Sequence, residues 1–238
     1  MNEQPAGPDL SRFLDARLYP DLVEMGGLSS AMRALATEND VDLGTLCSEY
    51  GSGPGLFNSA VADSHRGRIS VLLGRRERMF SLNIQGRGFT WADGMTSDLH
   101  DLVSAVGAWQ RGVPVDDFTE MFPFMAAGRL ARAYESGDPV AAQWEWLRTA
   151  EVYAGERPLV DALYGDSHLR ALFPYISHGV LRLSTGRGVQ GAREMFISPL
   201  GHGRYRVEDT DSAVVRTVGA LAEVRQAAVG LLHGDRPR

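Results

Sequence analysis

His178 is the side chain in this sequence best suited to acid–base chemistry, because an imidazole titrates near neutral pH. It follows the segment Phe173-Pro-Tyr175, in which two aromatic residues flank a proline, and it leads a predicted strand. We interpret His178 as a candidate general acid or base. The alternative interpretation is a structural histidine that closes a turn.

Several residues near His178 could hold an anionic group. Arg182, Arg204 and Arg206 fall on polar positions of predicted strands, and Glu194 lies on the neighbouring strand. If these side chains share one sheet face, their guanidinium groups could clamp a carboxylate or phosphate with paired hydrogen bonds. An enzyme of this kind would use His178 as acid or base, Arg182 and Arg206 as the clamp, and no cofactor. The alternative is a solvated sheet face with ion pairs.

Trp144 is a further candidate for substrate contact. It lies two residues from Trp146 on a predicted helix, so the two indoles point in different directions and one of them could line a pocket. Core packing of both is the alternative. Cys47 lies among apolar neighbours, which favours a small buried side chain over a nucleophile.

The segment Gly186-Arg-Gly-Val-Gln-Gly191 has the glycine spacing of nucleotide-binding loops. In a dinucleotide-binding fold such a loop opens a helix, but here a second strand follows. The protein-kinase arrangement of strand, glycine loop and strand needs a strand lysine, and this chain contains no lysine. We therefore interpret the segment as a flexible hairpin turn.

The composition argues against several other classes of protein. The six histidines lack H-x-x-x-H spacing and there is one cysteine, so we expect no metal site and no intrachain disulfide. A net charge of −6 provides no overall positive field for nucleic acid or a phospholipid surface. The sequence has neither a signal-like apolar start nor a run approaching the roughly 18 apolar residues of a membrane span. We expect a cytoplasmic protein without nucleic-acid or membrane partners.

Period-two alternation of apolar residues predicts two sets of three strands. They lie near residues 68–73, 79–85 and 88–92, and again near 179–184, 193–199 and 203–208. Glycine turns close both meanders, and a capped amphipathic helix is expected after each. Similar residues at corresponding positions of the two meanders, such as Met79-Phe80 and Met195-Phe196, indicate an internal duplication. The alternative is that two unrelated meanders share such features.

The sequence therefore predicts an α+β fold of two β-β-β-α halves with a helical N-terminal cap. Ser11–Val23, Leu28–Thr37 and Leu43–Tyr50 are the expected helices of the cap, and the last helix is expected to carry Val214 and Val218 on its apolar stripe. The halves span residues 1–136 and 137–238. They form either two domains or one compact domain.

Five phrases of the sequence resemble one known family. They are Arg68 to Leu73, Ala92-Asp-Gly-Met-Thr-Ser-Asp-Leu99, Met121-Phe-Pro-Phe124, Gln143-Trp-Glu-Trp-Leu147 and Leu169-Arg-Ala-Leu-Phe-Pro-Tyr-Ile-Ser-His178. The chain resembles an actinobacterial family of unknown function labelled as natural product biosynthesis proteins. The resemblance implies secondary metabolism and action on a small-molecule or peptide intermediate, and it carries over no catalytic roles.

Two functions are therefore compared below. One is an accessory or tailoring protein of a bacterial biosynthetic pathway, which binds or converts an intermediate without a cofactor. The other is a non-catalytic protein-interaction or chaperone-like module, acting as a homodimer or with a partner protein. An inward-facing His178 or arginine in a pocket favours the first function, and a flat exposed apolar patch favours the second.

Overall fold

The computed structural model describes residues 13–47, 55–211 and 213–234. The chain divides into two compact units, Met1–Arg132 and Ala133–Arg238, which we call unit 1 and unit 2. The sequence predicted a boundary after residue 136, which is the last residue of helix α6 (Ala131–Ser136). In the structure the two units meet between Arg132 and Ala133, within that helix. The units are described separately below.

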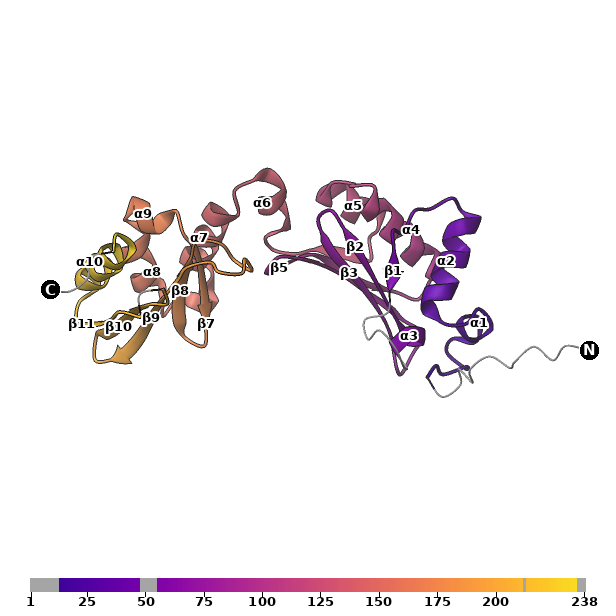
Figure 1. Cartoon of the computed structure of the whole chain (residues 1–238), viewed down its shortest axis with the longest axis horizontal. Helices are drawn as coiled ribbons and strands as arrows, with labels where there is room; N and C mark the ends of the chain where they lie inside the picture. The colour runs from indigo at the N-terminus through magenta and orange to yellow at the C-terminus, as the bar shows by residue number, and fades with distance from the viewer. Residues whose placement is uncertain (1–12, 48–54, 212, 235–238) are drawn as a thin grey trace, which may run out of the picture. The chain divides into compact units, whose positions relative to one another are not determined.

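Unit 1 contains an antiparallel sheet in which the six strands follow one another in chain order (Figure 1). The strands are β1 (Leu46–Cys47), β2 (Ser59–Ser64), β3 (Gly67–Leu73), β4 (Phe80–Gly86), β5 (Phe89–Thr96) and β6 (Met125–Ala127). The three strands predicted from the alternating pattern correspond to β3, β4 and β5. Their inward positions, such as Ile69, Val71 and Ile84, are buried, as period-two patterning requires.

Helices cover one face of this sheet. They are α1 (Pro20–Glu24), α2 (Leu28–Glu38), α3 (Gly55–Asn58), α4 (Leu99–Gln110) and α5 (Val115–Met121). Asp98 is the N-cap residue of helix α4, and its carboxylate accepts hydrogen bonds from the backbone N–H groups of His100 and Asp101. The helix buries Trp109, whose ring lies 5.1 Å from that of Phe118 on α5, so aromatic packing joins these two helices.

Unit 2 contains a second antiparallel sheet, with the strand order β11-β10-β9-β8-β7. The strands are β7 (Phe173–Ser177), β8 (Val180–Ser184), β9 (Glu194–Gly201), β10 (Arg204–Asp209) and β11 (Val215–Val218). The predicted second meander corresponds to β8, β9 and β10, so the α+β class and the two meanders are confirmed. Strands β7 and β11 extend this meander at its two edges.

The helices of unit 2 pack on one face of its sheet. They are α7 (Pro139–Thr149), the 3-10 helix η2 (Glu151–Tyr153), α8 (Arg157–Tyr164), α9 (Ser167–Arg170) and α10 (Leu221–Leu232). Asp138 caps α7 by accepting a hydrogen bond from the Ala141 N–H, as its position before Pro139 predicts. Leu181, Leu183 and Ile197 point from the sheet into this core.

Three predicted helices differ from the structure. Among the described residues of Leu43–Tyr50, Leu46 and Cys47 form a strand that pairs with β2, and residues 48–50 lie outside the described ranges. Val215–Val218 is also a strand, because this β-branched V-R-T-V run pairs with β10, and the last helix begins only at Leu221. In Ser11–Val23, the helix begins at Pro20, and residues 11–12 are not described.

The predicted correspondence between the two meanders is correct for the glycine turns and wrong for the pairing of Met79-Phe80 with Met195-Phe196. Gly86-Arg-Gly88 and Gly201-His-Gly203 both lie at hairpin turns between the expected strands. Phe80, however, is fully buried, whereas Phe196 is half-buried and its neighbour Met195 occupies the core. Since adjacent strand residues face opposite sides, Phe80 corresponds to Met195 in the sheet. Internal duplication stays a prediction.

Candidate functional site

The sheet face of unit 2 that points away from its helices carries a row of half-buried polar and aromatic side chains. Strand register pairs Tyr175 with Arg182, Arg182 with Phe196, and Phe196 with Glu208. Because side chains alternate along each strand, these four lie on the face opposite the core residues Leu181 and Leu183. We call this surface the open face.

Arg182 stands at the centre of the open face between two aromatic rings. Its guanidinium carbon lies 4.8 Å from the ring centroid of Phe196 and 5.6 Å from that of Tyr175. Its Nε is buried and has no hydrogen-bond partner in the structure. None of the described acidic side chains forms an ion pair with Arg182. Arg182 thus presents a cation to the open face without a protein carboxylate to neutralise it.

Tyr175 and Glu194 form a hydrogen bond on this face. The Tyr175 hydroxyl donates to Oε1 of Glu194 at 2.7 Å. Burial and this hydrogen bond raise the pKa of the Tyr175 hydroxyl above its usual value, while the nearby Arg182 guanidinium acts in the opposite direction. Tyr175 therefore remains a protonated donor at neutral pH, and it is unsuited to act as a base.

Arg187 reaches the same tyrosine from the loop that joins β8 and β9. Its guanidinium carbon lies 5.2 Å from the ring centroid of Tyr175 and 5.5 Å from that of Phe173. It makes no ion pair with an acidic residue in the described ranges. Burial raises the pKa of the Tyr134 hydroxyl, and the positive charge of Arg187 opposes this shift. The glycine-rich loop thus brings a second guanidinium to the Tyr175 ring.

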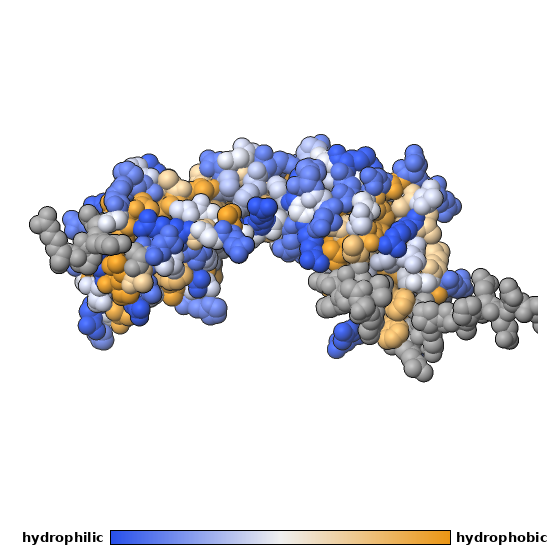
Figure 2. Space-filling model, viewed as in Figure 1, coloured by the Kyte–Doolittle hydropathy of each residue, from blue (hydrophilic) through white to orange (hydrophobic). Residues whose placement is uncertain are grey.

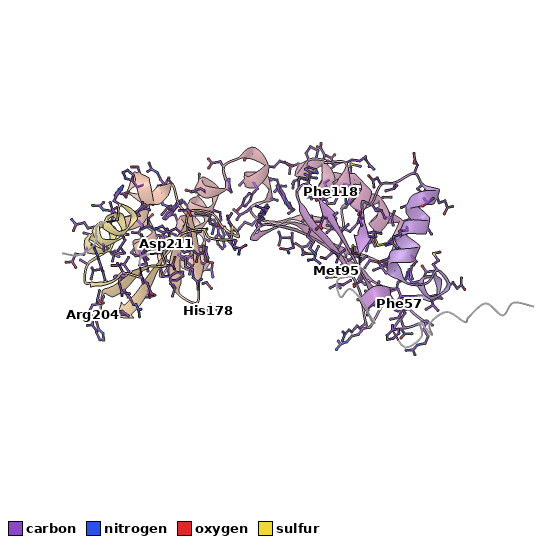
Figure 3. The ribbon with its side chains drawn as sticks, viewed as in Figure 1. Phe57, Met95, Phe118, His178, Arg204 and Asp211 are labelled. Atoms are coloured by element: carbon purple, nitrogen blue, oxygen red, sulfur yellow. The ribbon has the colours of Figure 1, made fainter. Side chains whose placement is uncertain are left out.

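Arg206 and Glu194 share this sheet face with Arg182, as the sequence interpretation required. Arg206, however, is paired with Glu208, at 3.0 Å between Nη2 and Oε2, and Glu194 accepts the Tyr175 hydrogen bond. Arg204 is exposed at the end of the β9–β10 hairpin (Figure 3). The structure therefore brings Arg182 and Glu194 together around Tyr175 and places Arg206 two strands away.

His178 lies in the tight turn between β7 and β8 rather than in a strand (Figure 3). It is exposed, its φ is 52°, and its Nδ1 lies 3.0 Å from the Ser177 hydroxyl. Gly179, with φ 73°, completes the left-handed pair that a two-residue hairpin of this kind requires. The turn accounts for the position of His178, which is open to solvent.

Trp144 lies in the core of unit 2 and not on the open face. Its side chain is fully buried, and its indole N–H donates to the backbone carbonyls of Arg170, at 2.9 Å, and Leu172, at 3.0 Å. These bonds tie α7 to the segment that leads into β7. Core packing, the alternative considered from the sequence, describes this residue.

Sequence reasoning missed Arg187 and Tyr134. The Gly186–Gly191 segment is a hairpin connection, as predicted, but no local pattern indicates that it lies against β7, a strand that is not its neighbour in the chain. The available signal was an arginine within a glycine-rich loop next to strands rich in aromatic residues. Tyr134 gave no signal, since it lies on α6, outside every predicted strand.

A hollow lies beside the C-terminal half of α10. Its volume is about 540 Å³, and its lining includes Asp166, Arg225 and His233. The His168 and His233 rings are 4.9 Å apart, edge to face. Although burial acts to raise the pKa of Asp166, the backbone N–H groups of Leu169 and His168 outweigh it and lower that pKa. Asp166 caps α9 with these bonds, so it has a structural role.

Two further findings concern metal ions and membranes. Within the described ranges, no three His, Cys, Asp or Glu side chains are grouped so that they could hold a metal ion. None of the helices in that part of the chain is long and apolar enough to cross a membrane.

The comparisons with known proteins concern unit 2. A family model described as "Family of unknown function (DUF6193)" matches residues 138–235. Unit 2 is thus similar to a family of unknown function, and the open face lies wholly within the matched region. No curated protein and no solved structure matches the chain.

Proposed function

We propose that the chain is an accessory or tailoring protein of a bacterial natural-product pathway, acting in the cytoplasm. In this proposal, unit 2 binds an anionic small-molecule or peptide intermediate on its open face. The observation that carries the proposal is the placement of Arg182 and Arg187 against the one ring of Tyr175, with no ion-pair partner for either among the described acidic residues.

The charge of the chain makes this arrangement unusual. Acidic residues outnumber basic ones, and the net charge is −6, so a carboxylate partner for each arginine is easily supplied. The neighbouring Arg206 has such a partner in Glu208. Guanidinium groups that lie against aromatic rings rather than carboxylates can still donate from their terminal Nη groups, and paired N–H donors of this kind bind carboxylates and phosphates in a bidentate manner. An anionic ligand would neutralise them.

Conversion of the bound intermediate, if it occurs, needs acid–base groups but no cofactor in this proposal. Tyr175 can donate a proton or a hydrogen bond to the ligand, because its raised pKa keeps it protonated. His178 remains the proposed acid or base, and it lies in the turn that directly follows β7, the strand that carries Tyr175. A His178→Gln variant that retains binding but loses conversion would support this role.

The test is genetic and uses the full chain. Deleting the gene in its producer and comparing metabolites identifies the intermediate that accumulates. Complementation with the Arg182→Gln, Arg187→Gln double variant is expected to leave the metabolite profile of the deletion unchanged, whereas the Arg206→Gln variant should restore the parental profile. Full complementation by the double variant would overturn the proposed role of the open face.

A protein-interaction module is the second candidate. Leu72 and Met95 on the sheet of unit 1 are 46% and 62% exposed, and register places both opposite Ser81, so they lie in one row. Hydrophobic and hydrophilic residues are interspersed on the visible face of each unit (Figure 2). An exposed apolar row of this kind suits a partner protein or a second copy of the chain.

The same complementation assay separates the two candidates. If a Leu72→Ser, Met95→Ser variant fails to restore the profile while the double arginine variant restores it, the interaction module is the better description. Sedimentation velocity of the purified chain adds a direct measurement, since a homodimer held by this row would dissociate in the serine variant.

A further inference from the structure

We propose that the anionic group held by the open face is a phosphate monoester rather than a carboxylate. This inference rests on the proposed function and names the ligand class of the same site. It is drawn from the number of unneutralised charges, from the atoms that each guanidinium can offer, and from the loop that carries Arg187.

Two guanidinium groups and one carboxylate, that of Glu194, lie around Tyr175. Arg182 and Arg187 contribute two positive charges, and neither is neutralised by an ion pair in the described part of the chain. A carboxylate carries one negative charge and two oxygens, which one bidentate guanidinium satisfies. A phosphate monoester carries about −1.5 to −2 at pH 7 and three terminal oxygens, so it can engage two guanidinium groups at once.

The geometry favours a compact group with several oxygens. The Nε of Arg182 is buried and inaccessible, so this arginine can offer only its terminal Nη groups to a ligand. It approaches the Tyr175 ring from β8, while Arg187 approaches the same ring from the loop. Two guanidinium groups from two different segments thus lie within 6 Å of one ring centroid, so a ligand at this ring meets both charges.

The loop offers further donors. Gly188, Gln190 and Gly191 are exposed, and the backbone N–H groups of these three residues have no hydrogen-bond partner among the described residues. Glycine at positions 188 and 191 has positive φ, 68° and 78°, so the backbone can turn its amides without a side chain in the way. The amides of Gln190 and Gly191 are consecutive, and successive amides of this kind form anion-binding sites in proteins.

The experiment measures binding of three probes to the full chain by calorimetry. Phenyl phosphate and benzoate share a phenyl ring and differ in their anionic group, and inorganic phosphate lacks the ring. Phenyl phosphate is expected to bind at least about tenfold more tightly than benzoate, and inorganic phosphate should displace it. Arg182→Gln and Arg187→Gln should each raise the Kd for phenyl phosphate about tenfold or more, because each loses a charge-assisted hydrogen bond.

Arg206→Gln is the matched control, since it removes the same charge from the same sheet face but from a paired arginine. Its Kd should stay within about twofold of the wild type. An equal loss in this control would overturn the inference, because general charge would then explain binding. Tighter binding of benzoate would overturn the phosphate assignment and leave the proposed anion site standing. Absence of binding by all three probes, or failure of inorganic phosphate to compete, would also overturn the phosphate assignment.

Circular dichroism melting of each variant separates lost binding from lost folding. The arginines lie on a half-exposed surface, so the melting temperatures of the two variants should match that of the wild type. The metabolite test of the proposed function is independent of these probes. A pathway role can therefore be established even if its anion proves to be a carboxylate.

Discussion

Arg193 and Asp209 form a bidentate ion pair in unit 2, with Nε 2.9 Å from Oδ1 and Nη2 2.9 Å from Oδ2. Asp209 is fully buried at the end of β10, and Arg193 lies directly before β9. The same guanidinium donates to the backbone carbonyls of Leu231 and Leu232, the last residues of α10. One arginine thus satisfies a buried carboxylate and the carbonyl end of a helix.

The first prediction concerns this pair. Asp209→Asn keeps the shape of the side chain but removes the charge that neutralises Arg193, and breaking one partner of a buried pair costs about 3–5 kcal/mol. The free energy of unfolding of unit 2, measured by urea titration, should fall by about this amount. Glu208→Gln breaks the exposed pair with Arg206 and should cost at most about 1 kcal/mol. Similar losses in both variants would contradict the structural role of Asp209.

The second prediction concerns pH and unit 1. Arg78 donates to both carboxylate oxygens of Asp21, at 2.7 and 2.8 Å, and this hydrogen bonding lowers the pKa of Asp21 below its usual 3.8. A carboxyl with a lowered folded-state pKa stabilises the fold above its unfolded pKa, and this stabilisation is lost as pH falls through the folded pKa. Unit 1 should therefore lose stability below about pH 3.8.

Asp21→Asn should make the unfolding free energy of unit 1 less dependent on pH in that window, and Arg78→Gln should have the same effect because it removes the partner. The measurement is a series of urea titrations between about pH 2 and 6. A pH profile in both variants as steep as that of the wild type would show that other carboxyl groups control acid unfolding.

The third prediction tests a close backbone approach in the first meander. Gly67 has φ 140°, and a Cβ atom there would overlap the carbonyl oxygen of Gln85 on the adjacent strand. Gly67→Ala should destabilise unit 1 by about 3 kcal/mol or more, since the strands must separate. Gly26→Ala, at φ 84° with no atom closer than 3.7 Å, should cost only about 1 kcal/mol of backbone strain. Equal losses of unfolding free energy in the two variants would show that the spacing between β3 and β4 at Gly67 can adjust to a side chain.

The strands that the sequence predicts well are those with one buried and one exposed face. Alternation in β3 and β4 follows directly from this arrangement. β2 escaped prediction because Ser59 to Ala62 are all buried, which removes the alternation. β7 was not predicted because it contains Pro174, and proline is unfavourable in most strands, although an edge strand such as β7 tolerates it.

The candidate site was predictable only in its local part. Strand alternation placed Arg182 and Glu194 on one face, because register follows from the period of two. The position of Arg187 depends instead on how a glycine-rich loop lies over a strand that precedes it in the chain, and no local spacing encodes that contact. The sequence offered ion pairing on this face as an alternative, but it did not identify Glu208 as the partner of Arg206, because pairing depends on side-chain rotamers.

The fourth prediction concerns Trp144. Trp144→Phe keeps an aromatic ring in the core but removes the N–H that bonds the carbonyls of Arg170 and Leu172. Leaving these groups unsatisfied should cost unit 2 about 1–3 kcal/mol. The Kd for phenyl phosphate should be the same as in the wild type, because the indole lies in the core. A changed Kd with unchanged stability would instead support the substrate-contact role inferred from the sequence.

The fifth prediction concerns Glu194, which lies beside the proposed anion site. Its carboxylate accepts the Tyr175 hydrogen bond, and its negative charge opposes an incoming phosphate. Glu194→Gln keeps an oxygen for Tyr175 and removes the charge. With the dielectric constant of water, two unit charges about 5–7 Å apart interact by about 0.6–0.8 kcal/mol, so the variant should bind phenyl phosphate at least about threefold more tightly.

The same variant should also lower the pKa of Tyr175, because burial, the Glu194 hydrogen bond and the Glu194 charge all raise it in the wild type, and the variant removes that charge. An NMR titration of labelled tyrosine measures this change. Weaker phosphate binding by Glu194→Gln would mean that Glu194 contacts the ligand directly as an acceptor, and the ligand would then carry a donor group beside its anion. Unchanged binding would place the anion away from Tyr175, closer to the amides of the glycine-rich loop.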